Sequence, residues 1–334
     1  MPELPEVETI RRGLTGLIVG KTVQGAHNYD SAKSFPNAQA DVQQFLVGAQ
    51  VTAVRRRAKV LLVDLSTDYT LVCHLKMTGQ IVVVGASMEL QPSGGVSPSS
   101  TTTSRQASFR GRGESSEFIS EPSGGVSPSL RWGGGHPNDS LIRTLPDNTT
   151  RERLDFTDGT QLFFNDLRKF GWMKLYPTSE VPNMTFMQKV GPEPLESAFT
   201  GEVLYERLQR RKNTNIKAAI LDQTVLAGVG NIYADESLWM VQLHPATQVK
   251  NIPPEQIESL AYAVKSVMNL SIAKGGSTDK NYVNAEGKKG SYLSFANVFR
   301  RQGQPCPRCG TTITKLRVAA RGTHICPTCQ KVIP

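Results

Sequence analysis

The second residue of the chain is a proline, and glutamates follow it closely. Removal of the initiator Met1 would leave Pro2 with a secondary α-amine. An unperturbed α-amino group has a pKa of about 8, against about 10 for lysine, so part of it is an uncharged nucleophile near neutral pH. Glu3 and Glu6 are three residues apart and would share one helical face, from which both could act as acid/base groups. The pattern predicts an amine nucleophile assisted by carboxyl groups; an ordinary structural role for Pro2 is the alternative.

Four of the five cysteines form two C-x2-C pairs near the end of the chain. Cys306 and Cys309 are separated from Cys326 and Cys329 by sixteen residues. Two such pairs suit one tetrahedral Zn²⁺ ion held by four thiolates. Four thiolates leave no open coordination position, so the metal would be structural and would stabilise the fold. Disulfides are the alternative, and Cys73, in an apolar stretch, is expected to fill core space.

The positive charge of the chain is concentrated at the same end. The sequence carries 38 Lys and Arg against 29 Asp and Glu, a net charge of +9. Residues 274–334 hold eleven of the basic residues and two acidic ones, so they account for the entire excess. A positive field confined to one end favours a module that binds a polyanion such as nucleic acid. A zinc site would hold Lys315, Arg317 and Arg321 in the fixed array that phosphate binding requires.

A helix and a set of short strands are expected to position the first group of residues. Apolar positions from Val7 to Leu17 follow helical spacing, with Pro5 near the first turn. Short apolar runs bounded by turn residues follow and predict an antiparallel sandwich. These runs cover residues 51–54, 60–65, 69–75, 80–84, 153–156, 161–164 and 172–176. No run approaches the ~18 apolar residues of a membrane helix, and the N-terminus lacks a signal-peptide pattern, so a membrane or secreted protein is not expected.

One segment of the N-terminal half departs from this pattern. Within the segment 86–148, residues 91–129 are rich in serine, glycine and proline, and the octamer PSGGVSPS occurs at both 92–99 and 122–129. Such a segment buries too little apolar surface to offset its ordering entropy. We therefore expect a disordered insertion in a loop of the sandwich.

The second half of the chain is expected to be helical. Gly191-Pro192-Glu193-Pro194 is typical of a linker, and the apolar spacing then predicts helices at 203–210, 216–226, 232–241 and 257–274. Between the second and third helices lies Ala227-Gly228-Val229-Gly230-Asn231. Its glycines permit a tight bend, and Asn231 is a candidate N-cap for the next helix. A helix N-terminus there would present backbone N–H groups to a phosphate.

These features occur together in motifs that resemble the formamidopyrimidine-DNA glycosylase family. In chain order the motifs are MPELPEVETIRRGL at 1–14, RAK at 57–59, HLKMTG at 74–79, RKFG at 168–171, GPEPL at 191–195, GVGNIYA at 228–234 and the four-cysteine finger. They run through nearly all of the chain outside the insertion. The family excises oxidised purines such as 8-oxoguanine from DNA and cleaves the resulting abasic site.

The resemblance implies an α+β fold in three parts. An N-terminal antiparallel β-sandwich with an N-terminal helix would cover 1–190, and a linker would follow at 191–198. A helix–two-turn–helix domain would cover 199–292, and a four-cysteine zinc finger 293–334. The resemblance also implies a cleft that grips double-stranded DNA containing oxidised bases or abasic sites, one structural Zn²⁺ ion, and a monomer in the cytoplasm associated with the nucleoid.

The resemblance also assigns the catalytic groups. The amine of Pro2 would attack C1′ of the damaged nucleotide, expel the base and leave a Schiff base, after which β- and δ-elimination cut the strand. Glu3 would act as general acid/base at the sugar, and Glu6 would support the cationic intermediate. Lys59 would meet the lesion or its phosphate.

A damaged base inside the duplex must leave the stack before it can react. By resemblance Met77 fills the vacated space, Arg168 hydrogen-bonds the orphaned base, and Phe170 wedges between neighbouring pairs. Core packing is the alternative for Met77 and Phe170, although Phe170 is expected at an exposed turn tip. The other residues expected at the DNA are His74, Lys217, Asn231 and Arg321.

The chain departs from the usual family pattern near these wedge residues. Leu167 and Lys169 replace a proline and an arginine, and Lys76 replaces a common glycine. Two other functions remain open: an endonuclease VIII-like glycosylase for oxidised pyrimidines, and a non-catalytic protein that binds damaged DNA. The opening residues 2–8, together with Met77, Arg168 and Phe170, favour the purine-specific enzyme over the first of these. The intact Pro2, Glu3 and Glu6 argue against the second.

Overall fold

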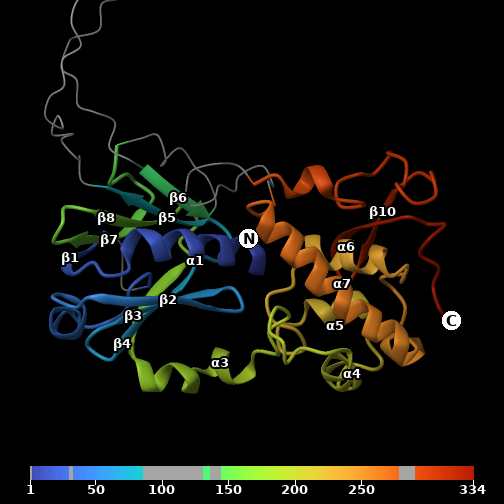
Figure 1. Ribbon diagram of the computed structural model, residues 1–334, viewed down its shortest axis with the longest axis horizontal. Helices are drawn as coiled ribbons and strands as arrows, with labels where there is room; N and C mark the ends of the chain where they lie inside the picture. The colour runs from blue at the N-terminus through green and yellow to red at the C-terminus, as the bar shows by residue number, and fades with distance from the viewer. Residues whose placement is uncertain (1, 30–32, 86–130, 136–143, 278–289) are drawn as a thin grey trace, which may run out of the picture.

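Two lobes meet at the N-terminus of the chain, as the computed structural model shows (Figure 1). The structure describes residues 2–29, 33–85, 131–135, 144–277 and 290–334. The first lobe contains two antiparallel sheets and the long helix α1, whereas the second contains most of the remaining helices and a two-stranded hairpin. The predicted α+β fold is confirmed.

The first lobe is the predicted antiparallel sandwich. Its five-stranded sheet has the order β1-β7-β8-β5-β6, and its four-stranded sheet has the order β2-β3-β4-β9. The strands are β1 (Val23–Asn28), β2 (Val51–Arg57), β3 (Val60–Leu65), β4 (Tyr69–His74), β5 (Gly79–Val84), β6 (Arg131–Gly135), β7 (Thr150–Phe156), β8 (Gln161–Asp166) and β9 (Trp172–Pro177). Alternate valines, leucines and phenylalanines of the two sheets face each other and form one apolar core, which includes the buried Cys73.

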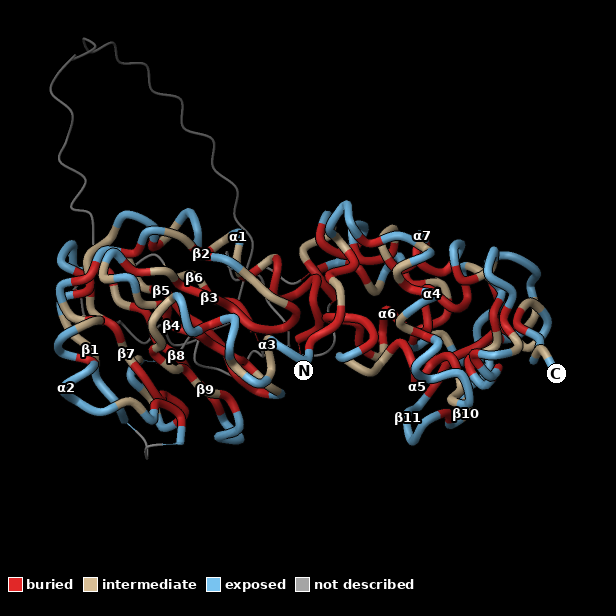
Figure 2. The backbone as a smooth tube through the Cα atoms, turned by 90° about the horizontal axis from the view of Figure 1, so that it is seen from below, coloured by how far each residue is buried: buried red, intermediate tan, exposed pale blue. Residues whose placement is uncertain are grey.

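Helix α1 (Leu4–Ile18) joins the two lobes. Its apolar stripe, which includes Val7, Ile10 and Leu14, packs into the core of the sandwich. Leu4 belongs instead to the apolar core of the second lobe. The first turn of α1 is therefore held by the second lobe and the rest of the helix by the first. Figure 2 shows the buried stretches of both lobes meeting beside the N-terminus.

The prediction of a disordered insertion over 86–148 was wrong for residues 131–135. These residues form strand β6, which pairs with β5 at the edge of the five-stranded sheet. A Cβ atom on Gly134 would lie 2.7 Å from Cγ1 of Ile10, so the glycines admit α1 against the strand. Glycine here serves close packing, whereas its abundance in the sequence resembled low complexity. Residues 144–148 are also described, and the backbone N–H of Asp147 donates to Oγ1 of Thr150 at 3.0 Å. The rest of the predicted insertion, 86–130 and 136–143, lies outside the described residues.

The second lobe follows the predicted helical spacing, with one shorter helix. Its helices are α4 (Gly201–Gln209), α5 (Ile216–Leu221), α6 (Asn231–Met240) and α7 (Pro254–Ala273). The prediction that the second helix continues to residue 226 was wrong, because Asp222 turns the chain. Its Oδ1 accepts hydrogen bonds from N and Oγ1 of Thr224, at 2.9 and 2.7 Å. Such a side-chain turn competes with helix continuation.

Shorter elements complete the two lobes. They are α2 (Gln39–Asp41), the π-helical turn η1 (Val42–Leu46), η3 (Thr178–Asn183), α3 (Thr185–Lys189), η4 (Val249–Asn251) and η5 (Tyr292–Phe295), together with the hairpin strands β10 (Thr314–Val318) and β11 (Arg321–Ile325). Among the described helices, none combines the length and the apolar character needed to cross a membrane.

Candidate active site

The N-terminus is anchored to the glycine loop that precedes α6. The backbone N–H of Leu4 donates to the carbonyl of Gly228 at 3.1 Å. Gly228 has φ +77°, and a Cβ atom there would lie 2.4 Å from Cβ of Leu4. A residue with a side chain would be strained at this φ and would collide with the helix. The loop thus fixes the buried Pro2 and Glu3 at the junction of the two lobes.

Glu3 lies against the beginning of α6. Its Oε1 accepts a hydrogen bond from the backbone N–H of Ile232 at 3.3 Å, and a Cβ atom on Gly230 would lie 2.1 Å from Cδ of Glu3. Its Oε2 is buried and has no hydrogen-bond partner in the described part of the chain. Burial raises the pKa of Glu3 to about 7, with the opposing charge of Lys59 limiting the rise. A carboxyl group with this pKa is partly protonated at neutral pH and is suited to both accept and donate a proton.

Glu6 is held by several donors within the protein. It accepts hydrogen bonds from the backbone N–H of Glu3 and from both N and Oγ of Ser277, each at 2.9 Å, and another from the hydroxyl of Tyr233. Tyr233 in turn contacts Oγ of Ser271 at 2.6 Å. Glu6 thus fixes the backbone at Glu3 and ties α1 to the second lobe, and its expected role as an acid/base group stays a prediction.

Lys59 approaches the same junction from the sandwich. Its Nζ donates to the carbonyl of Val229 at 3.0 Å, so it reaches the glycine loop. Burial lowers the pKa of Lys59, and the carboxyl groups of Glu3 and Glu6 oppose this shift. Lys59 thus lies close enough to Glu3 for their charges to interact within the buried junction.

The segment expected to be a linker also anchors the turn that carries Lys59. Glu193 is buried and accepts hydrogen bonds from Nη1 of Arg56 at 2.7 Å and from Nη1 of Arg57 at 2.9 Å. It also accepts one from the backbone N–H of Ala58. Sequence reasoning missed this residue, although an acid between two prolines and an Arg-Arg pair were both visible signals.

The three expected wedge residues lie together on two neighbouring loops. Met77 is 44% exposed and Phe170 is 53% exposed, so core packing is excluded for both. Nη1 of Arg168 lies 3.3 Å from Sδ of Met77, and its guanidinium carbon lies 4.9 Å from the centre of the Phe170 ring. The loops therefore present apolar and cationic side chains on one exposed tip.

His74 and Lys217 are less accessible than their expected DNA-binding roles require. Nδ1 of His74 accepts a hydrogen bond from the backbone N–H of Lys76 at 3.0 Å. Burial, with smaller contributions from nearby lysines, lowers the pKa of His74 to about 3, so the ring is neutral. Lys217 is 0% exposed, and its Nζ bonds Oδ1 of Asp235 at 2.5 Å and Oγ1 of Thr323 at 2.7 Å. The expectation of direct DNA contact by Lys217 is corrected, because the side chain joins α5 to α6 and β11.

Asn231 and Arg321 lie on facing elements at the other side of the junction. The expectation that Asn231 caps α6 was wrong: Gly230 is the cap residue and Asn231 is the first helical residue. Its Nδ2 instead donates to the carbonyl of Gly322 at 3.0 Å, which joins α6 to β11. Arg321 is exposed at the start of β11, and its charge lowers the pKa of the nearby Lys59, although burial contributes more.

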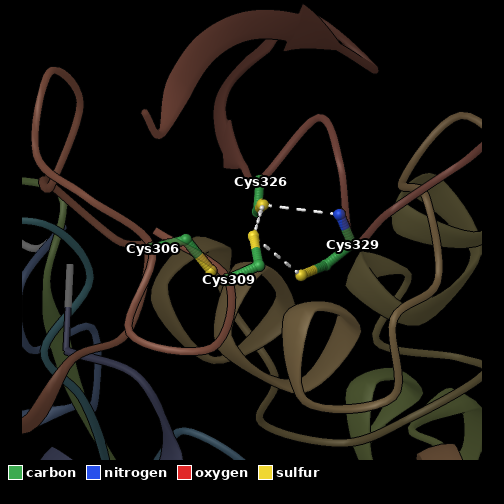
Figure 3. Close-up of side chains that lie close together, drawn as sticks. All are labelled: Cys306, Cys309, Cys326 and Cys329. Carbon is green, nitrogen blue, oxygen red and sulfur yellow. Dashed lines mark hydrogen bonds between the residues drawn. The ribbon is translucent and has the colours of Figure 1, made fainter. Parts of the chain in front are cut away.

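The four paired cysteines converge beneath the hairpin (Figure 3). Their sulfur atoms all lie within 4.8 Å of one another, and Sγ of Cys309 is 3.4 Å from Sγ of both Cys326 and Cys329. Four sulfurs about 2.3 Å from one Zn²⁺ ion would be about 3.8 Å apart, so the cluster fits a single ion. Trp239 packs against Cys306 at one side of the cluster.

Comparison with known protein families covers almost the whole chain. Residues 1–173 match the formamidopyrimidine-DNA glycosylase N-terminal domain, residues 190–282 the H2TH domain of the same family, and residues 303–332 a zinc finger found in FPG and IleRS. The last match contains all four clustered cysteines, which confirms the predicted structural zinc site.

Curated relatives and solved structures agree. The chain is 34% identical over 331 residues to a formamidopyrimidine-DNA glycosylase of Bacillus cereus and 37% identical over 330 residues to one of Pediococcus pentosaceus, with 99% of each chain covered in both comparisons. A complex of Lactococcus lactis Fpg with DNA containing an abasic site has a TM-score of 0.75 at 27% identity, covering 98% of this chain and 99% of the other. A structure of MutM with DNA containing carbocyclic 8-oxo-G has a TM-score of 0.74 at 27% identity, covering 99% and 100%. The chain belongs to the formamidopyrimidine-DNA glycosylase family.

Proposed function

We propose that this protein excises oxidised purines from duplex DNA and cleaves the resulting abasic site. One observation carries the proposal: Pro2 and Glu3 are buried between the two lobes, where Lys59 and the Gly228–Gly230 loop converge on them. Family membership supports the same activity. In this proposal the N-terminal amine is the nucleophile and the lobes deliver the damaged nucleotide to it.

The reaction assigns one step to each group at the junction. The nitrogen of Pro2 bonds to C1′ of the sugar as the bond from C1′ to the base breaks, and loss of the ring oxygen from C1′ leaves a Schiff base. Glu3, whose pKa burial raises to about 7, exchanges the protons that these steps require. Lys59 adds positive charge beside the sugar and its phosphates, and Glu6 holds the backbone of Glu3 in place. Elimination at the β and then the δ position cuts the strand on both sides.

DNA binding is assigned to residues at two places. Asn231 and Arg321 would hold the phosphates around the extruded nucleotide, since both lie beside the junction on α6 and β11. Met77, Arg168 and Phe170 would enter the duplex where the base has left, which fits their exposure and mutual contact. The zinc-bound cysteines would keep the hairpin of Arg321 in place.

We also propose the division of the chain into a catalytic sandwich (1–190), a linker (191–198), a helix–two-turn–helix domain (199–292) and a zinc finger (293–334). The partner is double-stranded DNA that contains oxidised bases or abasic sites, bound by a monomer. A cytoplasmic location in association with the nucleoid follows from this partner.

Borohydride trapping tests the nucleophile. Reduction of the Schiff base on an 8-oxoguanine:C duplex should link protein and DNA covalently, and peptide mapping should place the sugar on Pro2. An N-terminal tag or Pro2→Gly should reduce the adduct strongly, whereas the same tag at the C-terminus should not. A linkage at an internal lysine, or full activity with Met1 retained, would overturn the assignment.

Substrate choice separates the proposal from its alternatives. Excision of 8-oxoguanine should exceed excision of thymine glycol under matched conditions. The reverse order would indicate an endonuclease VIII-like enzyme. Tight binding to lesion DNA with no adduct from a correctly processed terminus would indicate a binding protein without catalysis.

A further inference from the structure

Asp166, the last residue of β8, is fully buried beneath the exposed tip that carries the wedge residues. Its Oδ1 accepts hydrogen bonds from Oγ1 of Thr78 and from the backbone N–H of Arg168, the latter at 3.2 Å. Its Oδ2 accepts from the backbone N–H groups of Phe170 at 2.8 Å and of Gly171 at 2.6 Å. Both oxygens of one carboxylate are therefore engaged by two donors each.

These donors come from two different loops. Thr78 ends the loop between β4 and β5, which carries Met77, whereas Arg168 and Phe170 lie in the loop between β8 and β9. The hydroxyl of Thr78 also accepts the backbone N–H of Arg168 at 3.1 Å. The carboxylate of Asp166 and the hydroxyl of Thr78 thus form the polar link between the two loops.

The backbone of each loop is held in an unfavourable conformation just before its wedge residue. Lys76, directly before Met77, has φ +51°, and Lys169, directly before Phe170, has φ +58°. Residues other than glycine rarely adopt such angles, and surrounding contacts must compensate for the strain. A Cβ atom on Gly171 would lie 2.7 Å from Cζ of Phe164 and 3.1 Å from Oδ2 of Asp166, so glycine admits the close packing of this loop against β8.

The structure assigns Asp166, through Thr78, the role of a positioning residue that makes the two loops act as one preassembled wedge. This inference rests on the proposed function, since it concerns how Met77 and Phe170 enter DNA together. Arg168 already contacts both side chains in the free protein. A preassembled wedge loses little conformational freedom on insertion, so opening of the lesion pair is faster than with two independent loops.

Only a carboxylate can serve all four donors. An asparagine at position 166 has one acceptor oxygen instead of two. In one orientation its NH₂ group would face the N–H groups of Phe170 and Gly171, and in the other it would face the donors of Thr78 and Arg168. Valine at position 78 keeps the shape of threonine but cannot donate to Asp166. Serine at position 78 keeps the hydroxyl and loses the methyl group. The two replacements therefore separate the hydrogen bond from packing.

The test compares Thr78→Val, Thr78→Ser and Asp166→Asn with the wild type. Thr70→Val is the matched control. Thr70 is a buried strand residue whose hydroxyl donates a 2.8 Å hydrogen bond to Oδ1 of Asp64, and neither residue belongs to the two wedge loops. Single-turnover rates are measured on an 8-oxoguanine:C duplex and on a preformed abasic site. A 2-aminopurine beside the lesion reports unstacking by stopped-flow fluorescence.

Thr78→Val and Asp166→Asn should slow both lesion excision and the fluorescence rise at least tenfold. Cleavage of the abasic site, where no base pair has to be opened, should change less than threefold. Thr78→Ser and Thr70→Val should behave like the wild type. The inference is overturned if Thr78→Val unstacks the lesion at the wild-type rate, if Thr78→Ser is as slow as Thr78→Val, or if both substrates slow equally. A wild type that gives no borohydride adduct would refute the proposed function instead.

Discussion

Replacing Gly230 with alanine adds one carbon atom at the centre of the site. Gly230 has φ −131° and ψ −166°, which alanine adopts without strain, so the effect comes from the side chain alone. The new Cβ atom would lie 2.1 Å from Cδ and 2.3 Å from Oε1 of Glu3. Ordinary contact between such atoms needs about 3.5 Å, so the carboxyl group must move by more than about 1 Å.

The displaced carboxyl group should affect catalysis more than folding. The atoms that collide are the end of a flexible side chain, so we expect a loss of at most about 1–3 kcal/mol in the free energy of unfolding. Movement of Glu3 also breaks its hydrogen bond with the N–H of Ile232. A misplacement of about 1 Å at a catalytic group costs on the order of 100-fold in rate, and we expect a loss of this size.

Single-turnover excision of 8-oxoguanine is the assay, with duplex affinity and urea unfolding measured in parallel. Gly16→Ala is the matched control, because Gly16 lies within α1 and a Cβ atom there meets nothing within 4 Å. It should keep the wild-type rate and gain about 0.5–1 kcal/mol in stability. A Gly230→Ala protein that excises the lesion within threefold of wild type would show that Glu3 does not act from the position described.

Three further predictions follow from buried charges and from the metal. Burial raises the pKa of Glu3 from 4.5 to about 7, so between these pH values Glu3 keeps a proton in the folded chain that the unfolded chain has lost, and the free energy of unfolding should fall as pH rises. This fall should be up to about 3 kcal/mol smaller in Glu3→Gln, and urea unfolding with the same pH dependence in both proteins would contradict the prediction. Lys217→Met removes the lysine from its buried ion pair with Asp235, which keeps its contacts with His324, and should cost about 3–5 kcal/mol. Arg211→Met, at an exposed ion pair, should cost less than about 1 kcal/mol, and similar unfolding midpoints for the two variants would refute this contrast. Cys306→Ser should lower the zinc content, measured by atomic absorption, from one ion per chain to none, and should abolish duplex binding, measured by fluorescence anisotropy. Circular dichroism should show that the sandwich stays folded, and unchanged affinity for the duplex at matched salt would contradict the prediction.

Features set by local spacing were predictable from the sequence. The apolar stripe of α1 matches its buried face, and the two C-x2-C pairs meet in one cluster. Most strands of the sandwich also begin and end within a few residues of their apolar runs. In each case neighbouring residues carry the structural information, because the apolar residues of a buried helix or strand face recur with the period of that element.

Features set by distant partners were not predictable in this way. Asn231 looks like a helix cap by local rules, but its side chain reaches Gly322, which lies 91 residues later in the chain, between the two cysteine pairs. A lysine at position 217 is compatible with DNA binding in the sequence, but in the fold its charge is paired with Asp235 inside the protein. Gly134 reads as part of a low-complexity segment because the reason for its small size, Ile10, lies far away in the sequence.

Contacts between distant residues also make the geometry of the site depend on how the two lobes pack together. Leu4 packs into the second lobe while Val7, one turn later, packs into the sandwich, so the first turn of α1 spans the junction. Glu6 fixes the N–H of Glu3 from that turn and is itself bound by Ser277 and Tyr233 of the second lobe. A change in the relation between the lobes therefore moves Glu3 against the loop that contacts it. Because duplex DNA would contact both lobes, binding of the DNA would also set the position of Pro2 and Glu3 relative to the loop at Gly228–Gly230.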